Sequence, residues 1–214
     1  MFHVLSMLVR RPDFTREAFH AHYEGTHTPT ALPLMTGLEH YVRNHIVEVL
    51  CGEEPPFDTL SEFGYTNLEV MQQNVATMDS ERGAVVRADE LTFMDKPRNH
   101  FFEVRASRTL PSKGPVLEGG VKLAFLAKAR PDAKRGEFLA SYQRSLAGPL
   151  AKAAASAHWE AYAIGDREPA ADAASFAWFA PDSLDANEIR SWSQEASAHW
   201  ALRVEERVSV RLPI

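Results

Sequence analysis

The chain has 214 residues, enough for one large domain or two small ones, and 45% of them are hydrophobic, as in an ordinary globular protein. With 23 lysines and arginines against 29 acidic residues, the formal net charge is −6. This charge is poorly suited to nucleic acid or to an acidic membrane surface, so neither is an expected partner. The single cysteine, Cys51, excludes an intrachain disulfide and is typical of a reducing compartment.

The first residues of the chain indicate where the protein is located. Residues 1–5 enter a strand-like apolar run directly, without the charged segment and long apolar segment of a signal peptide. No apolar stretch approaches the roughly 20 residues that a membrane helix needs. We therefore expect a cytoplasmic protein without a membrane partner.

An internal repeat is the most informative feature of the sequence. The run VLSMLVRRP at Val4–Pro12 returns as LAFLAKARP at Leu123–Pro131, and an aspartate follows each run. Downstream, Phe19 and Tyr23 have counterparts in Phe138 and Tyr142. Residues 107–120 (SRTLPSKGPVLEGG) have the proline and glycine content of a linker. We predict one domain at residues 1–106, a linker at 107–120 and a second domain at 121–214.

The first half predicts the element order β-α-β-β-α-β. Phe2–Val9 is nearly continuous in apolar residues, which indicates a strand buried on both faces. Thr15 is an acceptable N-cap for the helix that follows, and Phe14 and Phe19 have the spacing of a hydrophobic staple. The other expected elements are strands at Gly37–Val49, Thr59–Tyr65 and His100–Ala106, and helices at Leu68–Met78 and Ser80–Leu91. The second half repeats this order less cleanly, with strands near 121–128, 158–164, 174–179 and 204–212, and helices near 134–155 and 185–200.

This order determines the expected fold class. A βαββαβ unit forms a four-stranded antiparallel sheet with both helices on one face. The other face has to be buried, because the apolar strands leave few polar positions on it. Two units in one chain solve this problem by packing sheet against sheet. We predict an α+β protein with two tandem ferredoxin-like domains that form one intramolecular α+β barrel.

The pattern Phe19-x-x-His22-Tyr23-x-x-x-His27-x-Pro29 resembles the signature of EthD-type domains in the dimeric α+β barrel superfamily. Further matches occur in the family's order and cover most of residues 2–106; they are Gly37-Leu38, Tyr41-x-x-Asn44-His45, Glu62 and Phe93-x-Asp95. The resemblance implies a ferredoxin-like fold, pairing through sheet faces, and a pocket between sheet and helices. It also implies chemistry like that of cofactor-free polyketide cyclases, dehydratases, decarboxylases and lactone isomerases.

The second half departs from this pattern. Opposite His27 it has Ala147 or Leu146, and nothing in it reproduces the pair Asn44-His45. We therefore expect a degenerate second domain, and a single active site in the first half.

Histidines dominate the first half, and five of them (His20, His22, His27, His40 and His45) lie within 26 residues. Histidine titrates near neutral pH, so this cluster favours acid–base chemistry. Phe19, Tyr23 and His27 are spaced to lie on one helix face, with His20 close to that face and His22 pointing elsewhere. We expect His27 to be held at a pocket rim as the principal acid or base, with Tyr23 beside it. His20 and His22 are candidate substrate-binding residues.

Strand residues complete the candidate site. Tyr41, Arg43 and His45 share one strand face, and Asn44 lies on the other. His45 and Glu62 are the expected catalytic partners that orient His27 or polarise a substrate oxygen. Tyr41, Arg43, Asn44 and Asp95 are candidate substrate-binding residues, although Asp95, before Lys96-Pro97, is also typical of a turn.

These residues predict a cofactor-independent enzyme that acts on a small aromatic or carbonyl-containing metabolite. The expected reaction is that of a lyase, dehydratase, decarboxylase or isomerase with a histidine acid or base. Two alternatives are a haem protein that uses His158 or His199 as the axial ligand, and a non-catalytic binder of small hydrophobic ligands. The sequence contains no zinc-binding spacing and no glycine-rich phosphate loop, so we expect neither a metal nor a cofactor. A homodimer of the whole chain also fits this interpretation.

The barrel prediction is tested by expressing residues 1–106 alone. This half should expose a sheet face that the second half normally covers, and an apolar patch of more than a few hundred Å² drives association. Sedimentation should therefore show a dimer or an aggregate. A stably folded, soluble monomer of residues 1–106 would contradict sheet-to-sheet packing.

Overall fold

The computed structural model describes residues 1–109, 120–154, 158–164, 171–180, 183, 185–195 and 198–210. The chain divides into two compact units. Unit 1 comprises Met1–His45, Pro56–Glu103 and Arg207–Pro213, and unit 2 consists mainly of Ile46–Pro55 and Val104–Glu206. Most of the expected linker lies outside the described residues, and the strand before it continues to Thr109, three residues beyond its expected end at Ala106.

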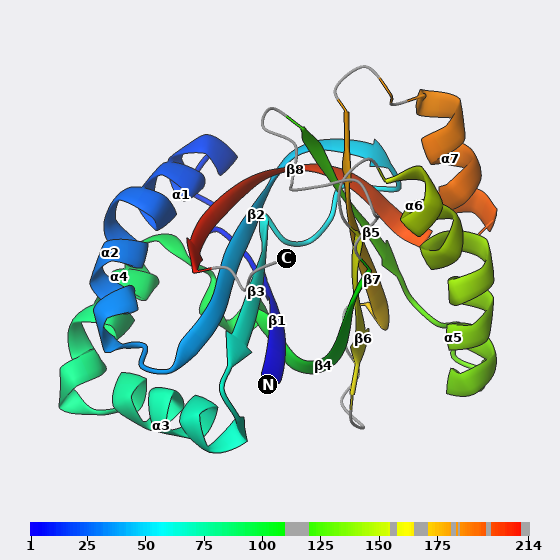
Figure 1. Cartoon of the computed structure of the whole chain (residues 1–214). Helices are drawn as coiled ribbons and strands as arrows, with labels where there is room; N and C mark the ends of the chain where they lie inside the picture. Colours follow the sequence, from blue (N-terminus) through cyan, green and yellow to red (C-terminus); the bar gives the residue numbers. More distant parts are fainter. Residues whose placement is uncertain are drawn as a thin grey trace. The chain divides into compact units, whose positions relative to one another are not determined.

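Unit 1 places its helices on one face of the sheet formed by β1, β3 and β2 (Figure 1). The strands are β1 (Phe2–Leu8), β2 (Leu38–Cys51), β3 (Thr59–Tyr65) and β4 (His100–Thr109). The helices are α1 (Arg16–His22), α2 (Thr28–Ala31), α3 (Leu68–Asp79) and α4 (Ala84–Phe93). A π-helical turn, Tyr23–His27, joins α1 to α2 and inserts one extra residue per turn.

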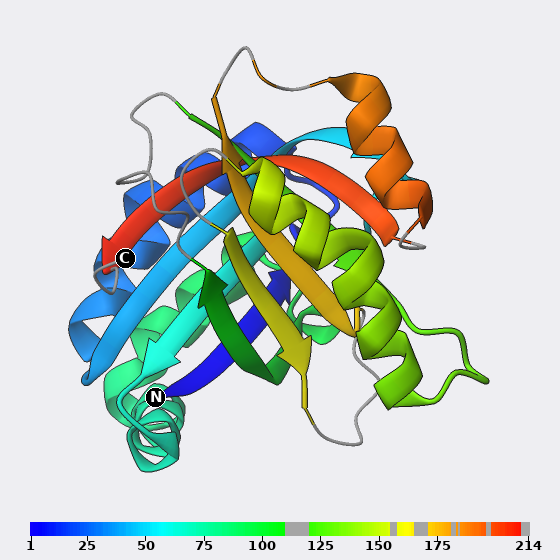
Figure 2. The same cartoon turned by 45° about the vertical axis from the view of Figure 1, so that its right-hand side comes forward.

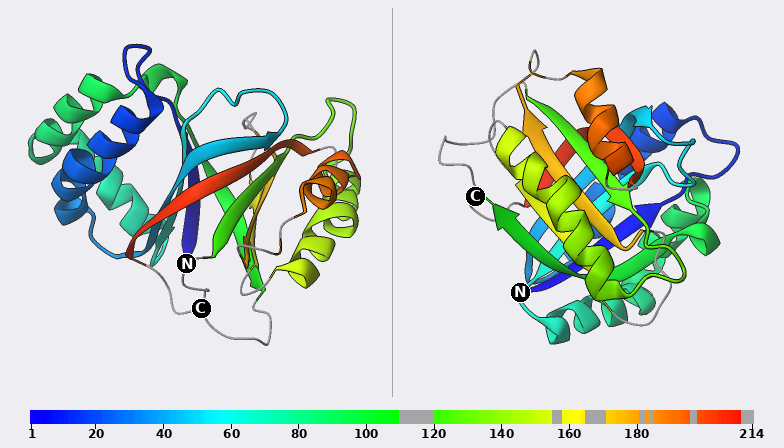
Figure 3. Two further views of the ribbon diagram at one scale, coloured as in Figure 1. Left: turned by 90° about the horizontal axis from the view of Figure 1, so that it is seen from above. Right: turned by 90° about the vertical axis from the view of Figure 1, so that its right-hand side faces the viewer.

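Unit 2 follows a similar order. Its strands are β5 (Val121–Ala127), β6 (His158–Ala163), β7 (Ala173–Phe179) and β8 (Ala198–Val210), and its helices are α5 (Arg135–Tyr142), α6 (Gly148–Ala153) and α7 (Ala186–Glu195). Figure 2 shows α5 and α6 running over β6 and β7, and in Figure 3 α7 lies on the same side of β5 and β7.

Two expectations for the second half are corrected by these bounds. The helix expected over 134–155 is interrupted by a second π-helical turn, Gln143–Ala147. The helix expected over 185–200 ends at Glu195, and β8 begins at Ala198 instead of near residue 204. The alternating run that follows Ala198 pairs with β5, and this pairing extends the strand toward the helix.

The strands follow the hydrogen-bonded order β1-β3-β2-β8-β5-β7-β6-β4, which closes as a barrel. The pairs β1–β3, β2–β3, β5–β7, β6–β7 and β5–β8 are antiparallel. The protein is therefore a mixed α+β structure with a closed antiparallel barrel. Within the described residues, no helix is both long enough and apolar enough to span a membrane.

The core of unit 1 fixes α1 against the sheet. Thr15 caps α1, and its Oγ1 accepts a hydrogen bond from the Ala18 amide at 3.1 Å. Phe14 packs on the cluster that contains Phe19, as the staple spacing predicts. The cluster also contains Tyr23 of the π-helical turn and Phe93 of α4. Both helical segments that carry the histidines are therefore anchored by buried aromatic rings.

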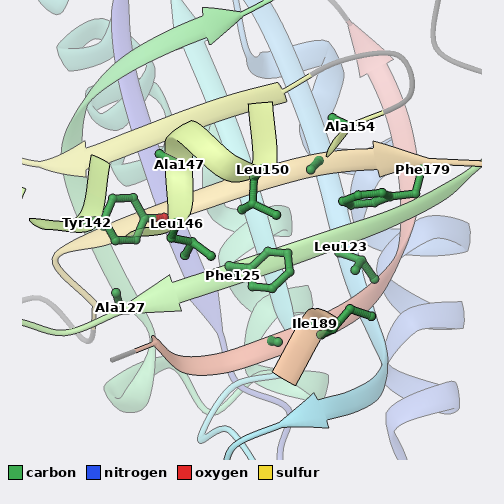
Figure 4. Packing of buried hydrophobic residues seen from close by; sticks show 13 residues of the cluster. Leu123, Phe125, Ala127, Tyr142, Leu146, Ala147, Leu150, Ala154, Phe179 and Ile189 are labelled. Carbon is green, nitrogen blue, oxygen red and sulfur yellow. The ribbon is translucent and has the colours of Figure 1, made fainter. Parts of the chain in front are cut away.

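The core of unit 2 lies between α5–α7 and the sheet (Figure 4). Phe125, Leu146, Leu150 and Phe179 are among its large apolar side chains, and all are almost completely buried. Leu146 and Ala147, the residues opposite His27 in the repeat, belong to this core. The position that carries His27 in the first half therefore carries a buried apolar side chain in the second half.

Two glycines of unit 1 should respond in opposite ways to substitution by alanine. Gly37 precedes β2 with φ +62°, and a Cβ there would lie 2.6 Å from Val70 Cγ1. Gly25 is exposed in the π-helical turn, and a Cβ there meets nothing within 4 Å. Gly37→Ala should lower the free energy of unfolding by about 1–3 kcal/mol, and Gly25→Ala should raise it by about 0.5–1 kcal/mol. Urea denaturation of both variants checks this; effects of the same sign would contradict it.

Candidate active site

The polar side chains of β2 alternate between the two faces of the sheet in unit 1. Tyr41, Arg43 and His45 face the helices, and each is buried. Tyr41 demonstrates this orientation, because its hydroxyl lies 3.1 Å from the Tyr23 hydroxyl of the π-helical turn. A layer of polar side chains therefore lies between this sheet and the segments α1, Tyr23–His27 and α4.

Tyr23 lies at the centre of this layer. Its hydroxyl is within 3.1 Å of both Tyr41 Oη and Ser61 Oγ, and its ring contacts those of His27 and His45 at centroid distances of 5.2 and 5.7 Å. Burial raises the pKa of Tyr23, and burial likewise raises the pKa of Tyr41. Both phenols therefore stay protonated at neutral pH and are able to donate hydrogen bonds.

Glu24 joins the π-helical turn to β2. Its carboxylate accepts two hydrogen bonds from Arg43, at 2.9 and 2.8 Å, and one from His45 Nε2 at 2.7 Å. Burial opposes ionisation of Glu24, but the hydrogen bonds from Arg43 and His45 outweigh it and lower the pKa of Glu24 to about 2. His45 Nδ1 lies 2.8 Å from Thr59 Oγ1, so both ring nitrogens of His45 are held.

The His20 ring packs against that of His45 with a centroid distance of 4.3 Å and a tilt of 36°. Its Nε2 lies 3.3 Å from the backbone carbonyl of Asp58, to which it donates. Burial, together with the neighbouring His45, lowers the pKa of His20 to about 4. The ring is consequently neutral at physiological pH.

His22 and His27 share one carboxylate. Asp89 of α4 has one oxygen 2.7 Å from His22 Nε2 and the other 2.9 Å from His27 Nδ1. Both rings also pack on Phe93, with centroid distances of 4.4 and 5.3 Å. Helical spacing predicted that His22 points away from His27, but the π-helical turn changes the helical phase, and both rings reach α4.

His27 Nε2 makes no hydrogen bond to any residue that the structure describes. The Asp89 carboxylate accepts a hydrogen bond from His27 Nδ1, so Nδ1 carries the proton of the neutral ring. The lone pair is then on Nε2. Burial lowers the pKa of His27, and the hydrogen bond to Asp89 opposes this only in part. The expectation that His27 is exposed at a rim is wrong, since its side chain is 8% exposed.

Two candidates lie on the other face of the sheet. Glu62 is 3.0 Å from His40 Nε2 and accepts a hydrogen bond from Asn44 Nδ2 at 2.7 Å. Glu62 pairs with Val42, and so projects away from Tyr41 and Arg43. The expectation that Glu62 orients His27 is therefore wrong, because Asp89 holds His27; the histidine that Glu62 contacts is His40.

Asp95 is also separate from the histidines. It lies in a turn, where its backbone amide donates a hydrogen bond to the Val9 carbonyl. Its carboxylate is 3.8 Å from the Arg98 guanidinium. The turn interpretation is the one that the structure bears out.

Asp89 and Glu24 are functional candidates that were not predicted from the sequence. The sequence carried a signal for Asp89. The buried Val86 lies three residues before it and the buried Phe93 four residues after it, so Asp89 is a carboxylate on the apolar face of α4. Glu24 carried no such signal, because its direction depends on the π-helical turn. In the part of the chain that the structure describes, no group of three metal-ligating side chains is arranged to hold an ion. The side chains of His158 and His199 lie outside the described residues.

The EthD domain family matches residues 11–97. Among solved structures, an anthrone oxidase-like protein is 13% identical, with 98% of this chain and 94% of the other covered and a TM-score of 0.59. A protein from Lactobacillus acidophilus named as a candidate monooxygenase is 10% identical, with coverage of 98% and 95% and a TM-score of 0.52. An EthD family protein from Bacillus halodurans is 27% identical over 48% of this chain and 96% of its own, with a TM-score of 0.38. No curated protein matches the sequence. The likenesses over nearly the whole chain establish its fold.

The pKa of His20 predicts how stability depends on pH. The unfolded chain binds a proton at His20 near pH 6.5, whereas the folded chain binds it near pH 4. The contribution of His20 to the free energy of unfolding is therefore fully present above pH 6.5 and is lost as the pH falls toward 4. The lowered pKa of His27 acts in the same direction. His20→Gln should remove about 1–2 kcal/mol of this loss, allowing for solvent screening of a partly exposed ring.

Urea denaturation at pH 7.5 and pH 4.5 measures the effect. His100→Gln is a suitable control, because His100 is exposed at the start of β4. The control should keep the pH dependence of the parent. An unchanged pH dependence in His20→Gln would contradict the assignment.

Proposed function

Since an EthD domain occupies residues 11–97, we propose that this chain is a small-molecule enzyme whose histidine layer removes a proton from a carbon that a neighbouring or conjugated carbonyl group makes acidic. The substrate class is a small aromatic or carbonyl-containing metabolite, and the reaction needs no cofactor. The observation that carries the proposal is His27, a buried neutral imidazole whose Nδ1 is held by Asp89 and whose Nε2 is left for a reacting atom.

The proposed step is general base catalysis. His27 Nε2 takes the proton as the C–H bond breaks, and the electron pair of that bond moves into an enolate. Asp89 accepts from Nδ1 and stabilises the imidazolium that forms, as the carboxylate does in hydrolase triads. A base works best with a pKa near the operating pH, and burial moves the pKa of His27 down from its ordinary value, which keeps the ring unprotonated at pH 7.

The enolate oxygen requires donors. Tyr23, Tyr41 and Ser61 form a chain of hydroxyl groups beside His27, and the raised pKa values of the two tyrosines keep their protons available. The Arg43 guanidinium, whose charge is paired with that of Glu24, lies 4.5 Å from the Tyr41 ring centre on the same side. These residues would stabilise the negative charge that develops on oxygen.

The fate of the enolate distinguishes the reaction classes. Return of the proton to a different carbon gives an isomerase, and loss of a leaving group gives a lyase. The similar structures carry the names anthrone oxidase-like protein and candidate monooxygenase, which suggests reaction of the enolate with dioxygen as the other route. Proton removal comes first in every case.

We also propose that the chain is a tandem of two ferredoxin-like domains, with the boundaries predicted from the sequence. Each half has a π-helical turn at the same place. The Tyr23 hydroxyl contacts Ser61, and the Tyr142 hydroxyl donates to Ser175 at 2.7 Å in the corresponding strand. Such repeated contacts support the duplication, and the association state of residues 1–106 tests it.

The proposed function is tested by solvent deuterium exchange into the acidic methylene of anthrone, measured by mass spectrometry under anaerobic conditions. The wild-type protein should accelerate exchange above the rate in buffer. His27→Gln should lower the accelerated rate by about 10²–10⁴-fold, because it removes the base. His22→Gln is the matched control: it loses the other hydrogen bond to Asp89 and should stay within about tenfold of wild type.

Circular dichroism confirms that both variants are folded. Full exchange activity in folded His27→Gln would contradict the assignment of the base. Binding of anthrone without any acceleration of exchange would favour the non-catalytic binder instead. Oxygen uptake in the aerobic reaction then separates the oxidase route from the isomerase and lyase routes.

A further inference from the structure

The sheet of unit 2 carries a buried lysine on the face that points away from its helices. Leu123 and Phe125 of β5 belong to the core beneath α5–α7, so Lys122 projects from the opposite face. Its neighbours across the sheet are Trp178 of β7 and Val204 of β8, and all three side chains are buried. An ammonium group therefore lies among apolar side chains.

Lys122 is held by a carboxylate and two aromatic rings. Its Nζ donates a hydrogen bond to Glu206 Oε2 at 2.7 Å, and it lies 4.4 Å from the centre of the Trp178 ring and 4.9 Å from that of Phe176. These contacts offset the cost of burying the ammonium group. A buried ion pair is seldom more stable than apolar side chains of similar volume, so stability does not explain why two charges occur here.

A pocket of about 560 Å³ is lined by Lys122 and Glu206, and this volume is within the range of small-molecule sites. Its apolar lining comes from Val47, Val121 and Val204, together with the Trp178 ring, and all of these residues belong to unit 2. Val47 is exposed, whereas the Lys122 side chain is 3% exposed. The pocket is therefore open to solvent at Val47 and reaches inward to the ion pair.

The other charges in the described lining act less strongly. Arg203 forms an ion pair with Glu48 at 2.8 Å, and both side chains are about half exposed. Glu205 is exposed as well. Water and salt screen charges in such positions. The ion pair of Lys122 and Glu206 therefore dominates the electrostatics of the pocket.

This ion pair presents a hydrogen-bond donor next to an acceptor and has no net charge. Glu206 would repel an anionic ligand, and Lys122 would repel a cationic one. A neutral group with an acceptor beside a donor fits both partners, and a primary carboxamide is such a group. The apolar lining suits an aromatic ring attached to it.

We propose that unit 2 contains a second small-molecule site, which binds a neutral aromatic carboxamide at the ion pair of Lys122 and Glu206. The carbonyl oxygen of the ligand accepts a hydrogen bond from Lys122 Nζ, the ligand N–H donates to the Glu206 carboxylate, and the ring contacts Val204 and Trp178. The proton transfer proposed at His27 uses none of these residues. The second half, which has no counterpart of His27, thus has a ligand site of its own.

Benzamide and N,N-dimethylbenzamide are matched probes for this site, because they share a ring and a carbonyl oxygen but only benzamide has N–H donors. Benzoate and benzylamine test the anionic and cationic alternatives. Nuclear magnetic resonance of the full-length protein should show benzamide shifting the indole signal of Trp178, which Trp178→Phe identifies. The other three probes should bind at least about tenfold more weakly.

Lys122→Met should weaken benzamide binding at least about tenfold, because it removes the donor to the carbonyl oxygen. Lys152→Met is the matched control, since Lys152 is exposed on α6, and it should bind benzamide like the wild type. If Lys122→Met does not fold, the double variant Lys122→Met, Glu206→Met removes both charges together. The double variant should bind benzamide and N,N-dimethylbenzamide equally.

The proposal is overturned if the wild-type protein binds benzamide no better than N,N-dimethylbenzamide, or not at all. Tighter binding of benzoate or benzylamine than of benzamide would also contradict it. So would a folded Lys122→Met or double variant that keeps the wild-type affinity for benzamide. His27→Gln should leave benzamide binding unchanged, so failure of the enzymatic proposal and failure of this one are distinguishable.

Discussion

The pair of hydrogen bonds from His22 and His27 to Asp89 is the interaction on which the candidate site depends. Burying an imidazole without partners is unfavourable, and the hydrogen bond to Asp89 offsets part of that cost for His27 while also holding the partly exposed His22. The same contact joins α4 to the segment around the π-helical turn, since Asp89 follows the histidines by more than sixty residues. It also determines which nitrogen of His27 carries the proton. The contact between α4 and the π-helical turn and the proposed chemistry of His27 therefore both depend on the Asp89 carboxylate.

The two-residue period of β2 divides the polar residues of unit 1 into two separate clusters. Tyr41 and His45 face the helices and join the layer around Tyr23. Asn44, between them in the sequence, faces the other way and contacts Glu62. The segment Tyr41–His45 forms one motif in the sequence, but its side chains project from both faces of the sheet. The first cluster supplies the proposed base and its donors, and the second is held by the contacts of His40 and Asn44 with Glu62.

Much of the fold follows from local sequence, while the partners of the histidines do not. The strand Thr59–Tyr65 and the cap at Thr15 were predicted because alternation and capping are local properties. The common face of Tyr23 and His27 was predicted from helical spacing, and their rings are in contact. Asp89 was missed because its contact joins distant segments, although its place among buried apolar residues of α4 was a usable signal. Glu62 was given the wrong partners because strand register had not been considered.

The protonation state of His27 tests the account most directly. Nitrogen-15 magnetic resonance of the histidine side chains distinguishes the two neutral forms of the ring from each other and from the cation. At pH 7 the account predicts a neutral His27 that carries its proton on Nδ1, toward Asp89, and a lone pair on Nε2. A His27 that is cationic at pH 7, or neutral with its proton on Nε2, would contradict the assignment of this residue as the base.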